Sequence, residues 1–416
     1  MSLPVLSIVA FAVAIVLSCV TPVNVGLVSI AFAFIVGVVF GGMPVQDVAR
    51  GFPSSLFLVL LGVTLLFSHA GVNGTLDQIA HRSLKLARGK PGWIPLVLFA
   101  LAATIASAGP GNIAATAMLA PVGLAVAGRS GISAFLMTVM VATGANSGAL
   151  SPFAPTGIIA NGILGRMGIN APWPTFYNNF IAQTFVALSA YFLFGGIRLL
   201  RLKGEPKPAD EQGLPPLTWQ QKLTMALIAA WIGAVLFLKV EIGMGAFIAA
   251  AVLTLARASD EERAVKSLPW GTIIMVSGVT VLIAILEKTG GMDLFTSLLA
   301  RLANPTNLTG VIAFVTGLIS VYSSSSGVVL PAFLPMIPGI IEKVGGGDPL
   351  AIAASINVGS HLVDVSPLST LGALCIASAP AHEDRRTLFN KLLAWGLSMS
   401  VVGALVCYLF FGVLAL

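Results

Sequence analysis

The sequence predicts an all-α polytopic membrane protein, built as two inverted repeats of five transmembrane helices. Three observations support this prediction. Hydrophobic residues make up 57% of the 416 residues and charged residues only 9%, whereas soluble domains carry roughly a quarter charged residues. Many apolar stretches are long enough to cross a bilayer. Two pairs of motifs rich in Gly, Ser and Pro also occur at corresponding positions of the two halves.

The apolar stretches define the expected spans, because a spanning helix needs about 20 mostly apolar residues. Ten stretches fit: 3–20, 23–42, 52–70, 132–165, 175–198, 223–239, 241–257, 270–287, 350–380 and 392–414. Two of them, 132–165 and 350–380, are too long for one helix. Gly, Ser and Pro interrupt both at the centre, so each is predicted to be a broken helix.

Two further apolar regions, 92–127 and 307–341, have a small polar turn at the centre. The turns read SAGPGN over residues 107–112 and YSSSSG over residues 322–327. Polar residues bound each region at both ends. Each region is therefore predicted to be a re-entrant hairpin that enters and leaves the membrane on one side.

The distribution of basic residues predicts the orientation, since cytoplasmic loops are enriched in Lys and Arg. If segment 74–91 is cytoplasmic and the hairpins do not cross, 16 of the 22 basic residues lie inside. The six outside are Arg50, Arg166, Lys239, Lys288, Arg301 and Lys343. We therefore expect a multi-pass protein of the bacterial inner membrane with both termini in the periplasm.

The two halves share a sequence signal. Nine of 36 positions are identical when residues 52–87 are aligned with 268–303, including Gly-Val-Thr at 62–64 and 278–280. Each half holds five crossings, an odd number, so the halves must be inserted in opposite senses. The predicted division is a first repeat over 1–200, a cytoplasmic linker over 201–222 and a second repeat over 223–416.

The four interrupted segments are the candidate transport site. Broken helices read GANSGALSPFAPTG (144–157) and GSHLVDVSPLSTLG (359–372), and paired interruptions of this kind point to a site near the membrane midplane. Non-helical backbone is tolerated there only beside protein or a water-filled cavity. The freed helix N-termini attract carboxylates. The candidate substrate ligands are Ser107, Asn112, Asn146, Ser147, Thr156, Ser324, Ser325, Ser326, His361, Ser366 and Thr370.

Charge is nearly absent from these segments. They contain no Lys or Arg, and their only ionisable residues are His361 and Asp364. An acid inside the membrane is a functional candidate, although Asp364 could equally accept a hydrogen bond from unwound backbone. His361 could likewise be a structural imidazole. The neutral oxygens of Ser, Asn, Thr and freed carbonyls suit sodium, which predicts sodium symport of an anion.

At these motifs the chain resembles anion carriers of the ion-transporter superfamily, most closely the malonate-carrier-like dicarboxylate permeases related to the divalent anion/sodium symporters. The resemblance covers nearly the whole chain. In those symporters each hairpin tip carries a Ser-Asn-Thr motif. Here Asn112 keeps the Asn of the first tip, and the second tip reads Ser324-Ser325-Ser326-Gly327.

The resemblance implies a secondary active transporter of small dicarboxylates of the malonate or C4 class. It also implies an elevator mechanism, in which hairpins and broken helices slide against a homodimeric scaffold in the lipid bilayer. Sodium would be the coupling ion, with no organic cofactor. The implied sodium ligands are Ser107, Asn112, Gly144, Ser151, Ser323, Gly359 and Asp364.

Other functions fit less well. An intramembrane hydrolase is disfavoured because the short spacing of His361, Asp364 and Ser366 does not by itself make a catalytic triad. The prediction is therefore that the chain is not an enzyme. A TRAP-type permease subunit, which needs a binding protein, and a proton-coupled anion carrier remain alternatives. No run of basic and aromatic residues suggests a nucleic-acid partner.

Overall fold

The computed structural model describes residues 2–21, 23–84, 90–202, 216–380 and 383–414. Helices and their connecting turns make up this described part, in which no strand occurs, and the all-helical prediction is confirmed. Seven helical segments within it are long and apolar enough to cross a membrane, and five shorter helices are also apolar. Residues 203–215 of the predicted linker lie outside the described residues.

The first half begins with α1 (Leu3–Val20) and α2 (Val25–Phe34), which continues as the π-helical η1 (Ile35–Phe40). The rest of this half consists of α3 (Val45–Ala49), α4 (Ser54–Val72), α5 (Thr75–Leu84), α6 (Trp93–Ala108), α7 (Gly111–Ser130), α8 (Ala134–Gly148), α9 (Pro155–Arg166), α10 (Pro172–Leu193) and α11 (Gly196–Arg201). Helices α6 and α7 pack together, and so do α6 and α8.

The second half begins with α12 (Trp219–Leu238), α13 (Ile242–Leu255) and the short α14 (Glu261–Lys266). It continues with α15 (Trp270–Lys288), α16 (Gly291–Ala300), α17 (Leu308–Ser320), η3 (Ser325–Val329), α18 (Leu330–Phe333), η4 (Leu334–Met336), α19 (Ile337–Val344), α20 (Pro349–Leu362), η5 (Val363–Val365), α21 (Thr370–Ala377), α22 (Arg385–Cys407) and η6 (Tyr408–Val413).

Close glycine crossings hold the long helices together in matching pairs. Helix α2 crosses α15 where a Cβ on Gly278 would lie 2.0 Å from the carbonyl oxygen of Gly26. Helix α4 crosses α13 where a Cβ on Gly62 would lie 2.6 Å from the carbonyl oxygen of Gly243. Contacts this short exclude any side chain, so small residues allow the backbones to touch.

The broken helices cross their hairpins in the same way. A Cβ on Gly144 of α8 would lie 2.6 Å from the carbonyl oxygen of Phe99 on α6. A Cβ on Gly359 of α20 would lie 2.5 Å from the carbonyl oxygen of Ala313 on α17. Each half therefore fixes its broken helix against the first arm of its hairpin by one glycine.

Several boundaries differ from the sequence predictions. The stretch predicted over 175–198 ends as α10 at Leu193, and Gly195 then adopts a φ of 105° before α11 begins. The second arm after the YSSSSG turn reaches Val344 and is divided into short segments. Three prolines, Pro331, Pro335 and Pro338, explain the division, because proline removes a backbone donor and clashes with the preceding turn.

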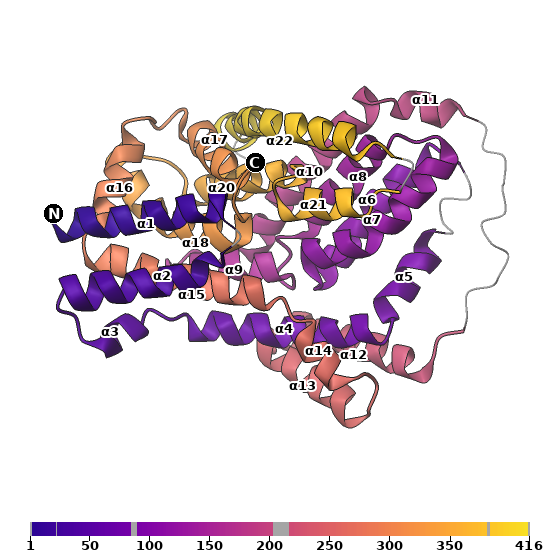
Figure 1. Ribbon diagram of the computed structural model, residues 1–416, viewed down its shortest axis with the longest axis horizontal. Coiled ribbons are helices and arrows are strands. Elements are labelled where there is room, and N and C mark those ends of the chain that lie inside the picture. Colours follow the sequence, from indigo (N-terminus) through magenta and orange to yellow (C-terminus); the bar gives the residue numbers. More distant parts are fainter. Residues whose placement is uncertain (1, 22, 85–89, 203–215, 381–382, 415–416) are drawn as a thin grey trace.

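The molecule is elongated, and its two ends differ. Figure 1 shows α3 and α16 at one end, with α5 and α11 at the other. Helix α4 runs along the lower side of the view from the side of α3 towards α5, and α12, α13 and α14 gather beside it. Helices α6, α7 and α8 lie nearer the end that carries α5 and α11, whereas α9 lies near the middle.

Candidate functional site

Both broken helices are interrupted where the sequence places Ser and Pro. Between α8 and α9 the chain turns through Ala149–Ala154, and the Ser151 hydroxyl donates to the backbone carbonyl of Ser107 at 2.7 Å. Helix α9 restarts at Pro155, a residue suited to a first helical turn because its missing N–H would have no partner there. The second interruption runs through η5 to Ser369, before α21.

A chain of amide hydrogen bonds joins the first hairpin tip to both broken helices. Asn112, at the start of α7, donates through Nδ2 to Oδ1 of Asn146 at 2.8 Å. Asn146 in turn donates to the backbone carbonyl of His361 at 2.8 Å. Asn179 of α10 donates to the backbone carbonyl of Asn146 at 2.8 Å. The sequence predicted Asn112 and Asn146 but missed Asn179, which lies within an uninterrupted helix.

The second hairpin tip contacts its broken helix through a carboxylate. The Ser325 hydroxyl donates to Oδ1 of Asp364 at 2.6 Å and lies 3.0 Å from the carbonyl oxygen of Ser360. It also shares a hydrogen bond with the Ser320 hydroxyl. Ser369 donates to the backbone carbonyl of Asp364 at 2.8 Å. Asp364 is only 6% exposed, so these serines replace the water that an acid normally contacts.

The His361 side chain forms its hydrogen bonds within its own helix, α20. Its Nδ1 lies 2.7 Å from the carbonyl oxygen of Asn357, one turn earlier on α20. Because a carbonyl only accepts, Nδ1 must carry the proton, and Nε2 is left as a buried acceptor with no partner among the described residues. The side-chain amide of Asn357 is likewise buried without a partner there. His361 is fully buried.

A cavity of about 550 Å³ reaches the hairpin tips from the side of α5. Three predicted substrate ligands line it: Asn112, Thr156 at the start of α9, and Ser326 beside the second tip. Polar residues that the sequence did not predict also line it, namely Thr64 and Ser68 of α4, Asp77, Ser267 and Thr272. Both halves of the chain line the cavity, since Ser326 and Asn112 come from different hairpins.

The remaining predicted residues lie outside the lining of this cavity. They are Ser107, Asn146, Ser147, Ser324, Ser325, His361, Ser366 and Thr370. Some brace the interrupted segments: the Ser147 hydroxyl donates to the Gly144 carbonyl at 2.7 Å, and Ser324 caps η3 by accepting from the Gly327 N–H at 3.0 Å. Ser147 and Ser324 therefore stabilise the interrupted segments near the cavity and do not line it.

The predicted sodium ligands fall into two groups. Ser107 and Ser151 are joined by their hydrogen bond, and Gly144 accepts from Ser147 beside them. Asp364 lies with the second group, near Ser325. No cluster of three or more His, Cys, Asp or Glu side chains suited to a metal occurs among the described residues. Any cation bound here would therefore be held largely by neutral oxygens.

The fold and the cavity define a helical membrane protein with paired hairpins and interrupted helices around a cavity that has several polar side chains in its wall. Comparison with known proteins gives its class. A family model described as "Dicarboxylate carrier protein MatC N-terminus" matches residues 1–149. An uncharacterized transporter of Mycobacterium bovis is 25% identical over 357 residues, covering 79% of each chain. An uncharacterized transporter of Synechocystis sp. is 22% identical over 380 residues, covering 85% of this chain and 84% of that protein.

Two solved structures share the fold. One is MtrF of Neisseria gonorrhoeae, described with a class of antimetabolite efflux pumps, at a TM-score of 0.57 and 14% identity. The match covers 98% of this chain and 94% of MtrF. The other is the YdaH transporter of Alcanivorax borkumensis, at a TM-score of 0.53 and 16% identity over 88% of this chain and 87% of that one.

Taken together, these likenesses make the chain a multi-pass membrane transporter similar to dicarboxylate carriers, and not an enzyme. The predictions that the protein is a membrane transporter and that it is not an enzyme are confirmed. The wider superfamily relationship and the choice of substrate stay predictions.

Proposed function

We propose that this protein is a secondary active transporter of small dicarboxylates of the malonate or C4 class in the bacterial inner membrane. The cavity carries this proposal. It places the amide of Asn112, the hydroxyl of Ser326 and Thr156 of the first turn of α9 around one space. Amides and hydroxyls donate hydrogen bonds to carboxylates. The match to a dicarboxylate carrier model over residues 1–149 supports the substrate class.

Charge balance supports a coupled cation. Among the described residues, the cavity lining contains no Lys or Arg, and its one ionisable residue is the acid Asp77. Burying unpaired charge costs several kcal/mol per ion, and a helix N-terminus supplies only about half a positive charge. Two carboxylates therefore need bound cations, and we propose sodium symport.

The oxygen cluster at Asp364 is a candidate place for the coupling ion. One hydroxyl proton on Ser325 faces two acceptors, Oδ1 of Asp364 and the carbonyl of Ser360. A single donor cannot fully satisfy both. A sodium ion would complete the cluster, and so would a proton on Asp364. The second possibility is the specific reason to keep a proton-coupled carrier as the alternative.

Alternating access is proposed to follow from two inverted repeats. The matching glycine crossings of α2 on α15 and α4 on α13 support a two-fold relation between the halves. In the proposed elevator mechanism, the hairpins and broken helices move against these crossed helices, which form the scaffold of a homodimer. The cavity then opens on one side of the membrane at a time.

The proposed orientation puts α5 and α11 in the cytoplasm and both termini in the periplasm. Cysteine placed at exposed Lys266 should then react with an impermeant thiol reagent only from inside. Cysteine at Lys343 should react only from outside. Labelling of both positions from one side would refute this orientation.

Uptake into proteoliposomes tests the function directly. Purified protein should accumulate radiolabelled malonate or succinate when an inward sodium gradient is imposed. The substrate concentration that gives the half-maximal uptake rate should fall as the sodium concentration rises. Vesicles without protein provide the background. Equal accumulation driven by a pH gradient in sodium-free buffer would identify the proton as the coupling ion. Absence of uptake for every small dicarboxylate under both gradients would refute the substrate class.

A further inference from the structure

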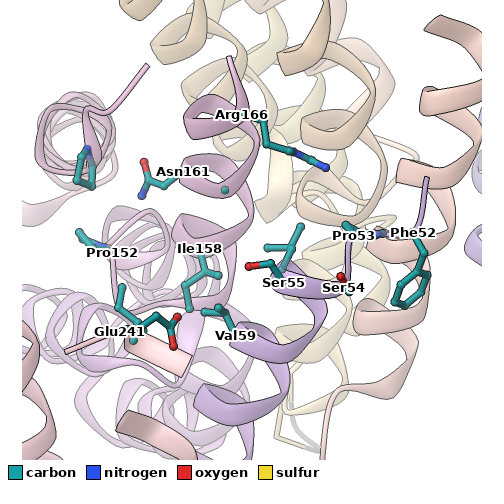
Figure 2. Close-up of a pocket in the computed structure, with 14 residues that line it drawn as sticks. Phe52, Pro53, Ser54, Ser55, Val59, Pro152, Ile158, Asn161, Arg166 and Glu241 are labelled. Atoms are coloured by element: carbon teal, nitrogen blue, oxygen red, sulfur yellow. The ribbon is translucent and has the colours of Figure 1, made fainter. Parts of the chain in front are cut away.

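A second cavity, of about 480 Å³, lies at the opposite end of α4 from the first. Its walls come from the beginning of α4, from α9 and from the residues that lead into α13 (Figure 2). Ser54 and Ser55 contribute hydroxyls, and Asn161 and Arg166 project from α9. None of these residues was predicted as a ligand from the sequence.

The cavity offers an available cation. The ion pairs within the described residues join Arg50 to Asp47, Arg263 to Asp260 and Lys266 to Glu262, so none of them uses Arg166. Glu287 is the acid whose charge acts on Arg166, but it lies beyond ion-pair distance in the described structure. Arg166 can therefore offer its planar fork of donors to a carboxylate.

An amide without partners lines the same cavity. Both Oδ1 and Nδ2 of Asn161 are buried and form no hydrogen bond within the described part of the chain. Buried amides nearly always have partners, and a ligand in the cavity can supply them here. Nδ2 of Asn161 is a suitable donor to a carboxylate oxygen.

The one acid in the cavity wall is already engaged. The carboxylate of Glu241 accepts from the backbone N–H groups of Gly243 and Met244, at 3.0 and 2.6 Å. Its negative charge is thus offset by the start of α13. Arg166 remains as the charge that determines which ligand the cavity attracts.

The two cavities share two walls. Helix α4 lines one with Ser55 and the other with Thr64, and α9 lines one with Ile158 and the other with its neighbour Ile159. Between the cavities, Leu60 and Val63 of α4 are almost completely buried in the same apolar core as Ile159. An apolar layer therefore separates two cavities that each carry a few polar side chains.

From this arrangement we infer a second anion-binding site in the cavity that Arg166 and Asn161 line, where Arg166 holds the carboxylate of a small organic acid on the far side of the apolar layer. The choice of ligand rests on the proposed function. In the proposed orientation this site faces the periplasm, so it would receive the substrate before the cavity at the hairpin tips does. The site itself follows from the cation and the unpaired amide.

The test measures protection of a nearby thiol. In a Cys19→Ser background, in which Cys375 and Cys407 are buried, Ser55→Cys is treated with an uncharged, membrane-impermeant maleimide. Malonate should slow the reaction several-fold. Arg166→Gln should abolish this protection, and Arg166→Lys should retain part of it. Arg50→Gln removes a positive charge that is paired with Asp47, and protection should persist in this matched control.

A second background separates this inference from the transport proposal. In Asn112→Ala, uptake should be lost while malonate still protects Ser55→Cys. Protection that persists in Arg166→Gln, or its absence with both malonate and succinate, would overturn the second site. If the Ser55→Cys protein shows Arg166-dependent protection while the wild-type protein shows no uptake, the transport proposal fails and the site stands.

Discussion

At the tip between α6 and α7, the protein contacts its broken helix through a neutral amide, from Asn112 to Asn146. At the tip before η3, the corresponding contact joins the Ser325 hydroxyl to the carboxylate of Asp364. Both tips reach the same cavity, through Asn112 and Ser326. The difference suggests a division of tasks, in which the first tip binds substrate and the second holds the coupling ion. Substitutions at the two tips and at Asp364 test this division.

Asn112→Ala should have the largest effect. It removes a cavity-lining amide and leaves Oδ1 of Asn146 without its donor. An unsatisfied buried group costs about 1–3 kcal/mol, and loss of a substrate contact adds to that. We expect malonate uptake to fall by about 100-fold, given that 1.4 kcal/mol corresponds to a factor of ten.

The control for Asn112→Ala is Asn304→Ala, at a residue whose side chain bonds only to its own exposed turn. Uptake by that control should stay near the wild-type rate. Size-exclusion profiles and thermal unfolding of both variants establish whether they are folded. A folded Asn112→Ala protein with wild-type uptake would remove the first tip from the site.

Asp364→Asn should reduce uptake by about 10-fold, because it removes the carboxylate that accepts from Ser325, and a hydrogen bond to a charged group is worth about 1.5–3 kcal/mol. The effect should appear mainly as a higher sodium concentration at half-maximal rate. Asp348→Asn, at the exposed start of α20, is the matched control. An unchanged sodium dependence in Asp364→Asn would separate the second tip from coupling.

The glycines of the two tips should respond differently to alanine. Gly109 has a φ of 139°, and a Cβ there would lie 1.9 Å from the ring of Phe67. Gly327 has an ordinary φ, and its closest neighbour is the flexible side chain of Met275. Backbone strain of this kind costs about 1–3 kcal/mol. Thermal unfolding of purified protein should show Gly109→Ala to be clearly the less stable variant, and equal stability would contradict this.

The smallest expected effect is that of Ser326→Ala. Its hydroxyl lines the cavity, and a net hydrogen bond is worth about 0.5–1.5 kcal/mol. The KM for malonate should rise by a few-fold with little change in maximal rate. Ser325→Ala, by contrast, removes the donor to Asp364 and should alter sodium dependence. The same change in both variants would mean that the two serines do not have separate tasks.

Much of the fold followed from simple patterns. Apolar stretches and interrupting Gly, Ser and Pro residues located the helices and the breaks near 149–154 and 363–369. The π-helical segments, such as Ile35–Phe40, were not predicted, because their apolar composition is the same as that of the α-helix before them.

The site was harder to predict than the fold. Asn112, Thr156 and Ser326 could be predicted from the sequence because they lie beside helix breaks. Asn179 and Ser68 could not be predicted, since each lies within a continuous helix and reaches the site only through the packing of that helix. The second cavity was missed for the same reason: its walls come from three segments that are distant in the sequence, 52–59, 152–172 and 241–242.

The amide of Asn146 affects how the sequences of the two halves can diverge in evolution. Asn146 and His361 align at the sequence offset of 215 that relates the broken helices, yet only Asn146 uses its side chain in the bond between them. His361 contributes its backbone carbonyl, which every amino acid possesses. Substitution at 361 can therefore preserve this link, whereas substitution at 146 breaks it. Selection acting through this bond falls on one of the two positions and leaves the other free to diverge.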